Sequence, residues 1–118
     1  MCPTIFTDTN GLRLVIGGSG GPKITTAVAS VSMRNLWFGE NIKQAIDSQR
    51  LHHQLFADEI IYEKQFPQNI LKQLKAKGHV VKQLSEGDRG AVIIAISKEN
   101  GKLYANSDYR KGGAVEGA

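Results

Sequence analysis

Residues 12–26 read LRLVIGGSGGPKITT, and this stretch decides the fold because an apolar strand runs into paired glycines and then a proline. Glycine has no side chain to block positive φ, so Gly20 and Gly21 can direct consecutive N–H groups at one oxygen. A helix that begins near Pro22 adds its positive dipole end. The turn suits a bound carboxylate or phosphate, or the oxyanion of acyl transfer. A glycine-rich turn without a ligand fits the same residues equally well.

Known nucleotide-binding and hydrolase motifs do not fit these glycines. A Walker A loop counted from Gly17 has Pro22 where its second glycine belongs. A dinucleotide fingerprint counted from Gly18 has Lys23 where a small residue must let the helix pack on the strand. Residues 17–21 have the form G-x-S-x-G only through their abundance of glycine, and the later Asp and His residues give a weak triad.

The composition indicates one domain-sized globular piece, with 118 residues of which 41% are hydrophobic and 22% charged. The net charge of +4 is spread along the chain, and the lysines at 72, 75, 77 and 82 are interpreted as a solvated helix face, so no nucleic-acid partner is predicted. Cys2 is the single cysteine, which leaves no internal disulfide and no thiolate metal site. No cofactor is predicted, and no stretch approaches the ~20 apolar residues of a membrane span.

The apolar pattern predicts mixed α and β layers with mainly antiparallel strands. Two hairpins are predicted, pairing 3–7 with 12–17 and 91–97 with 102–107 around Asn-Gly steps. One helix is predicted to begin near Pro22, although its Thr and Val residues would also tolerate a strand. A second is predicted after Gly39, ending near Arg50, and a third over 67–78, with strands over 58–63 and 79–84. Trp37 is interpreted as a core anchor, and 91–97 as a strand buried on both faces. The chain opens on a strand-like Met1 to Ile5, which suggests a cut inside a larger sheet.

Two charged clusters are assigned structural roles. In RLHHQ, adjacent histidines point in different directions, so Arg50, His52 and His53 are expected to bond to backbone and carboxylates rather than to hold a metal. In SDYRKGG, Asp108 and Arg110 are two residues apart and are expected to pair on one strand face, locking a corner of the sheet. Substrate binding through Arg110 is the alternative.

Four segments together resemble the C-terminal part of the small subunit, or light chain, of γ-glutamyltransferases, also called glutathione hydrolases. They are MCPTI at 1–5, GGSGGPKITTAV at 17–28, NLWFG…AID…RLHHQ at 35–54 and SDYRKGG at 107–113. These segments span nearly the whole chain in the family's order. Two departures are Gln49, where proline is common, and Pro22, where Ser or Thr often follows the glycines.

The resemblance implies an α+β fold of the N-terminal-nucleophile hydrolase type, an αββα sandwich of which residues 1–118 are the C-terminal part, incomplete at its N-terminal side. It implies transfer of the γ-glutamyl group of glutathione to water or amino acceptors by an N-terminal threonine. Gly20 and Gly21 match the glycines whose amides form the family's oxyanion hole and bind the γ-glutamyl substrate.

The resemblance also implies what lies upstream. The nucleophilic threonine and the groups that hold the substrate's amino and carboxylate ends precede the segment matched by 1–3, so this chain alone is expected to be inactive. Its implied partners are γ-glutamyl compounds, the large subunit and the missing N-terminal part of the light chain. A catalytically inactive remnant that acts as a binding or structural partner is the alternative. Resemblance to animal members implies the extracellular face of the plasma membrane.

Overall fold

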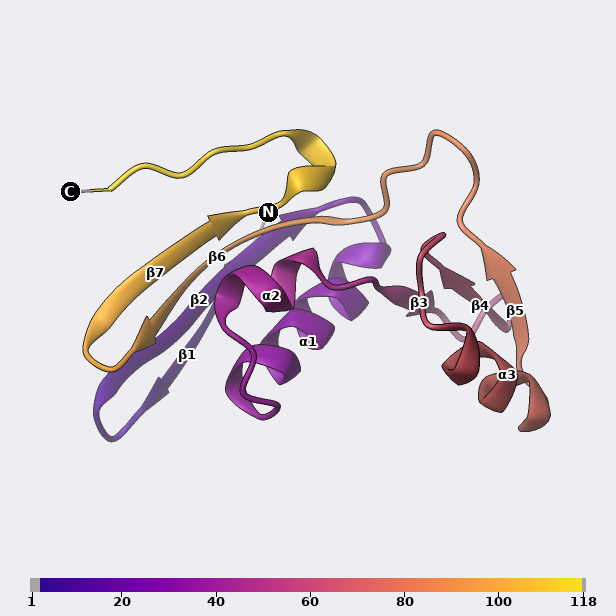
Figure 1. Ribbon diagram of the computed structural model, residues 1–118, viewed down its shortest axis with the longest axis horizontal. Helices are drawn as coiled ribbons and strands as arrows, with labels where there is room; N and C mark the ends of the chain where they lie inside the picture. The colour runs from indigo at the N-terminus through magenta and orange to yellow at the C-terminus, as the bar shows by residue number, and fades with distance from the viewer. Residues whose placement is uncertain (1–2, 118) are drawn as a thin grey trace.

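The computed structural model describes residues 3–117. Met1, Cys2 and Ala118 lie outside the described residues, and with them the expectations about Cys2 and about a strand that already begins at Met1. The described chain measures 45 × 29 × 24 Å along its principal axes. Figure 1 shows a long sheet with two helices against it and, beside these, a smaller sheet with a helix of its own.

A four-stranded antiparallel sheet with strand order β1-β2-β6-β7 forms the larger part. Its strands are β1 (Thr4–Asp8), β2 (Gly11–Ser19), β6 (Val92–Glu99) and β7 (Lys102–Ser107). Both predicted hairpins are confirmed, but their Asn-Gly steps turn differently. Asn100 and Gly101 both have positive φ, 51° and 78°, as a two-residue type I′ turn requires, whereas the first hairpin has its positive φ, 94°, at Gly11.

Helices α1 (Lys23–Leu36) and α2 (Ile42–Asp47) cover one face of this sheet (Figure 1). The core between them is a cluster of aliphatic side chains from β2, α1, α2 and β6, namely Leu14, Ile16, Ala27, Val31, Ile42, Ala45, Ile46, Ala91, Ile93 and Ala95. On β6 the burial alternates: Ile93 is 1% exposed and Ile94 is 47% exposed. The prediction of a strand buried on both faces is therefore wrong for the described residues, because their helices cover one face only.

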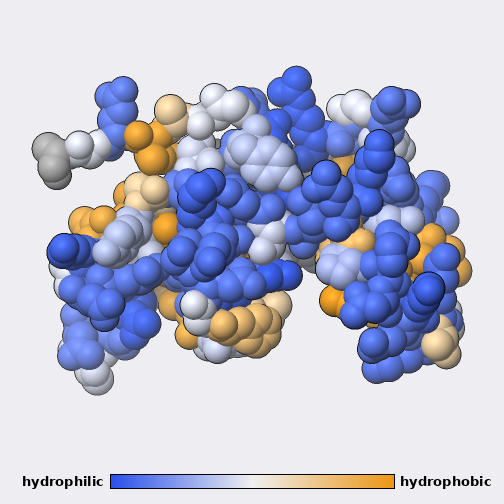
Figure 2. All heavy atoms as spheres, viewed as in Figure 1, coloured by the Kyte–Doolittle hydropathy of each residue, from blue (hydrophilic) through white to orange (hydrophobic). Residues whose placement is uncertain are grey.

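The smaller sheet has the order β3-β4-β5 and consists of β3 (Leu51–His53), β4 (Glu59–Tyr62) and β5 (Val80–Gln83). Strands β3 and β4 are antiparallel, and β4 and β5 are parallel because α3 (Gln68–Ala76) provides the crossover between them. The helix predicted over 67–78 and its two flanking strands are thus confirmed. Figure 2 shows mostly hydrophilic side chains over α3 on the face in view.

Two expectations about the segment after α1 are wrong. Trp37 is 72% exposed, because α1 ends at Leu36 and the indole lies at the C-cap, outside the core. The second helix ends at Asp47 instead of near Arg50, because β3 already begins at Leu51. Within residues 3–117, no helix combines the length and apolar character that a membrane crossing requires.

Candidate functional site

The glycine turn, which we define as Ser19 to Pro22, follows directly on the last pair of the β2–β6 ladder, Ser19 with Val92. Gly20 and Gly21 have φ of 133° and 61°, values that residues with a side chain rarely adopt. Neither of their amides donates a hydrogen bond to another described residue, whereas the Gly21 carbonyl accepts one from Ile24 N at 3.1 Å. The turn therefore presents two successive N–H groups that sheet and helix leave free.

The two glycines are needed for different reasons. A Cβ at Gly20 would lie 2.7 Å from Ala91 Cα and 2.9 Å from the Gly90 carbonyl oxygen, closer than real contacts allow. A Cβ at Gly21 would meet nothing within 4 Å, so only its positive φ argues for glycine there. Glycine at position 20 is thus required by packing against Gly90 and Ala91, just before β6, as well as by backbone conformation.

Helix α1 begins immediately after the turn. Pro22 stands at its N-cap with φ −62°, and no side chain caps the first turn. Proline has no N–H, so it adds no donor, but its fixed φ suits the start of a helix. The 14-residue helix brings its positive dipole end to the residue after Gly21. Free amides and a helix N-terminus together favour a negatively charged oxygen at this position.

His52 ties the first turn of α1 to β3. The side chain of His52 is 7% exposed, and its Nδ1 lies 2.8 Å from the Thr26 hydroxyl while Nε2 lies 3.2 Å from Gln54 Oε1. The Thr26 hydroxyl also donates to the Lys23 carbonyl at 3.2 Å, so it links the imidazole to the first residue of α1. His53, by contrast, is partly exposed and faces Asp58 at 3.1 Å. The contacts of His52 therefore link β3 to the first turn of α1, directly after the glycine turn.

Replacing His52 with phenylalanine is expected to lower the free energy of unfolding by about 0.5–1.5 kcal/mol, because the hydrogen bond that links Thr26 to β3 is lost. Urea unfolding followed by circular dichroism measures this. His53→Phe serves as the matched control, with an expected change within about 0.5 kcal/mol because its side chain is a surface group. Equal losses in the two variants would contradict the role given to His52.

Arg50, Asp108, Arg110 and Glu63 form one buried network. Asp108 is fully buried and accepts from Arg50 Nη2 at 2.7 Å, Arg110 Nη1 at 3.0 Å and the Ile93 amide at 2.9 Å. Arg110 also donates to both oxygens of Glu63, at 2.7 and 2.5 Å. Such bidentate, charge-assisted bonds are the strong ones, so the network joins the end of the four-stranded sheet to the region around β3 and β4.

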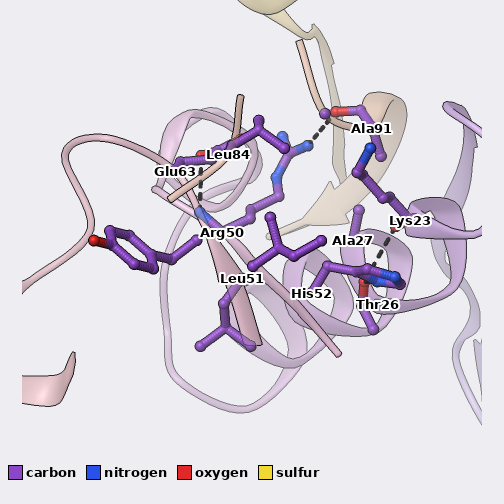
Figure 3. A pocket seen from close by; sticks show the side chains of 12 residues that line it. Lys23, Thr26, Ala27, Arg50, Leu51, His52, Glu63, Leu84 and Ala91 are labelled. Atoms are coloured by element: carbon purple, nitrogen blue, oxygen red, sulfur yellow. Dashed lines mark hydrogen bonds between the residues drawn. The ribbon is translucent and has the colours of Figure 1, made fainter. Parts of the chain in front are cut away.

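Arg50 extends the same network to the backbone just before β6, beside the glycine turn. Figure 3 shows its guanidinium reaching the Ala91 carbonyl, and Nη1 lies 2.8 Å from that oxygen. A small cavity of about 30 Å³ lies beside the Arg50 side chain, and its lining includes Lys23, Thr26 and His52. Among the residues that the structure describes, Arg50 Nε has no acceptor. The arginine thus holds the backbone at Ala91, against which Gly20 packs.

The expectation that Asp108 and Arg110 pair on a strand face is wrong in its geometry. Strand β7 ends at Ser107, and Asp108 caps the 3₁₀ turn η1 (Tyr109–Lys111) by accepting from the Arg110 amide at 3.1 Å. Asp-x-Arg here is a capped turn, which aspartate favours because its carboxylate reaches the amide two residues on. The side chains pair nevertheless, inside the network rather than on an exposed corner.

The network sets the ionisation of Asp108. Burial alone would raise the pKa of this carboxyl, but hydrogen bonds from Arg50 and the Ile93 amide outweigh it and hold the pKa below its usual value. Burial lowers the pKa of the Arg110 guanidinium, whereas Glu63 and Asp108 raise it, and the raising effects prevail. Both groups are therefore charged at neutral pH.

Stability is expected to fall in acid. A carboxyl whose folded-state pKa is depressed contributes stability that is present above its unfolded pKa and lost as the pH falls through the folded value. The pKa of Asp108 lies below 3.8, and so does that of Asp88, through its hydrogen bonds with Lys23 and the Gly90 amide. Urea midpoints measured from pH 7 downward should decline below pH 3.8, where these carboxylates take up protons. A midpoint that stays level down to pH 2 would contradict this ionisation.

Sequence reasoning missed two partners at the site. Glu63 was predicted only as part of a strand, yet it pairs with Arg110 across 47 residues. Asp88 is considered from the sequence only as the acid of a weak triad with His79, yet it pairs with Lys23 across 65 residues. No short-range pattern could have revealed these contacts. Within residues 3–117, no group of three or more His, Cys, Asp or Glu side chains lies close enough together to hold a metal.

Comparison with known proteins identifies the family. Residues 1–118 match the family described as Gamma-glutamyltranspeptidase. Scoloptoxin SSD20 of Scolopendra dehaani is 51% identical over 98% of this chain and 59% of its own length. The glutathione hydrolase proenzyme of Escherichia coli (strain K12) is 36% identical over 93% of this chain and 19% of its own length. Human glutathione hydrolase 5 proenzyme is 36% identical over 99% of this chain and 20% of its own length.

Solved structures agree with the sequence match. The gamma-glutamyltranspeptidase from Pseudomonas nitroreducens complexed with L-DON has a TM-score of 0.85 at 29% identity, over 100% of this chain and 62% of that one. The expected α+β, N-terminal-nucleophile hydrolase fold is thereby confirmed. The chain spans about a fifth of the glutathione hydrolase proenzymes, 19% for that of Escherichia coli. On the family match over its whole length, this chain belongs to the gamma-glutamyltranspeptidase family, a family of enzymes.

Proposed function

We propose that this chain supplies the oxyanion hole of a γ-glutamyltransferase that moves the γ-glutamyl group of glutathione to water or to an amino acceptor. The observation that carries the proposal is the pair of free, adjacent amides at Gly20 and Gly21. When a hydroxyl attacks the γ-carbonyl, negative charge develops on the carbonyl oxygen, and two fixed N–H donors stabilise that charge. The helix α1 dipole adds to the same effect.

In this proposal the nucleophile comes from polypeptide upstream of the matched segment. The resemblance assigns it to a threonine exposed at a new N-terminus, whose own amine acts as base. Thr4 and Thr25 do not match that threonine. The chain would be the C-terminal portion of a light chain, with the rest of that light chain and the large subunit as its partners. Residence at the extracellular face of the plasma membrane is proposed from the resemblance to animal members.

A graft tests the proposal. Residues 1–118 replace the matching segment of the Escherichia coli glutathione hydrolase, which is 36% identical to them, and release of p-nitroaniline from γ-glutamyl-p-nitroanilide is measured. The folded graft should turn over the substrate, and the 118-residue chain alone should not. Turnover by the chain alone, or a folded and processed graft without turnover, would contradict the proposal.

A second function is favoured by the uncovered face of the larger sheet. Ile5, Ile94 and Leu103 are 60%, 47% and 64% exposed there, which suits a surface that another chain covers. A light-chain remnant that binds a large subunit without catalysis would use this face. Co-purification of the chain with a large subunit, together with a graft that never turns over substrate, would support this role instead.

A further inference from the structure

The loop of residues 84–91, between β5 and β6, reaches the glycine turn at two places. At its end, Gly90 and Ala91 lie where a Cβ of Gly20 would be, at 2.9 and 2.7 Å. At its middle, Asp88 Oδ2 accepts from Lys23 Nζ at 2.7 Å. Lys23 is the first residue of α1 and follows the turn directly. One contact therefore supports Gly20 itself, and the other holds the residue after Pro22.

Asp88 is held in place for this contact. Its second oxygen, Oδ1, accepts from the Gly90 amide at 2.8 Å, and its own amide donates to the Ser85 carbonyl at 3.1 Å. The loop is thereby folded back on itself around the carboxylate. Lys23 and Asp88 side chains are 23% and 36% exposed, so the ion pair is partly shielded from solvent and from salt. Moving Asp88 would move the Gly90–Ala91 backbone that supports Gly20.

This ion pair differs from the exposed pairs of the chain. Lys43 and Asp47 are one helical turn apart, and the lysine side chain is 71% exposed. Arg13 and Asp8 lie five residues apart in one hairpin. Lys23 and Asp88 are 65 residues apart and join a helix start to a loop that lacks helix and strand. A pair of this kind restricts the relative movement of two segments, which a pair inside one helix cannot do.

The Gly20–Gly21 pair needs this restriction of backbone movement in order to act as an oxyanion hole. Two residues without side chains have the widest backbone freedom, and a donor pair stabilises an oxyanion only when its geometry is fixed before the reaction. We propose that Lys23 and Asp88 are positioning residues that latch the 84–91 loop to α1 and so hold the Gly20 and Gly21 amides in place. The consequence for catalysis rests on the proposed function, but the positioning itself is a property of this chain.

The test measures order at the two amides. Backbone ¹⁵N relaxation on the 118-residue chain gives order parameters for Gly20 and Gly21 in the wild type, Lys23→Gln, Asp88→Asn and Lys23→Arg. We expect a decrease from about 0.85 towards 0.6 in the first two variants and wild-type values in Lys23→Arg, which keeps the charge. Lys43→Gln is the matched control, since it removes a lysine ion pair away from the turn. Unchanged order parameters in both Lys23→Gln and Asp88→Asn would overturn the proposal.

Kinetics of the graft separate this proposal from the one on which it rests. In the graft, Lys23→Gln should lower kcat about tenfold with little change in KM, because the amides act on the transition state. Lys43→Gln should leave both constants unchanged. Lower order parameters combined with an unaltered kcat would support the latch and would contradict the oxyanion role of the glycines.

Discussion

Replacing Asp108 with alanine is expected to lower the free energy of unfolding by about 3–5 kcal/mol, because Arg50 loses its buried counter-ion and Arg110 loses one of its two. Asp108 is fully buried, and the side chains of Arg50 and Arg110 are 5% and 6% exposed. Removing the carboxylate also leaves the Ile93 amide without its acceptor. A loss of this size is a large part of the ~5–15 kcal/mol by which domains are stable, so unfolding at room temperature is an expected outcome.

Urea unfolding of Asp108→Ala beside Asp47→Ala isolates the effect of burial. Asp47 pairs with Lys43 on the surface of α2, where an ion pair is worth about 0–1 kcal/mol. Asp108→Asn keeps the shape and one acceptor oxygen, and we expect an intermediate loss. If Asp108→Ala and Asp47→Ala unfold at the same urea concentration, the network does not hold the two sheets together as described.

Replacing Gly20 with alanine is expected to lower kcat of the graft by about 10²–10³-fold, the usual effect of losing one oxyanion-hole donor. The added Cβ would stand 2.7 Å from Ala91 Cα at a φ of 133°, so the turn must move to accept it. Gly101→Ala controls for positive φ alone, because Gly101 has φ 78° and open space in the distant β6–β7 turn. It should leave kcat unchanged, and an equal fall in both variants would point to misfolding instead.

Much of the fold follows from short-range patterns in the sequence. Helix α3 has a proline before it, apolar residues on one face and Gly78 after it, and these signals lie within one segment. The glycine turn is equally local, because a strand, two glycines and a proline follow one another without interruption. Even here, glycine is required at position 20 because any Cβ would collide with Ala91, which is far away in the sequence.

What the sequence could not provide is the pairing of distant residues. Which carboxylate meets Arg110 depends on how the β4 region packs against the end of β7, and Glu63 lies 47 residues away from it. The exposure of Trp37 has the same origin, since an aromatic residue next to a helix is buried only where another element covers it. Likewise, the apolar run in β6 does not say whether both faces of its sheet are covered.

If Gly20 and Gly21 bind the oxyanion, a crystal structure of the graft with a γ-boronic acid analogue of glutamate will show both amides in contact with the bound analogue. Boron forms a tetrahedral adduct with a hydroxyl nucleophile and so imitates the intermediate of acyl transfer. We expect one boronate oxygen at about 2.7–3.1 Å from both glycine amide nitrogens. A boronate oxygen that is bound by other donors, with both glycine amides turned away from it, would mean that the glycine turn is not the oxyanion hole.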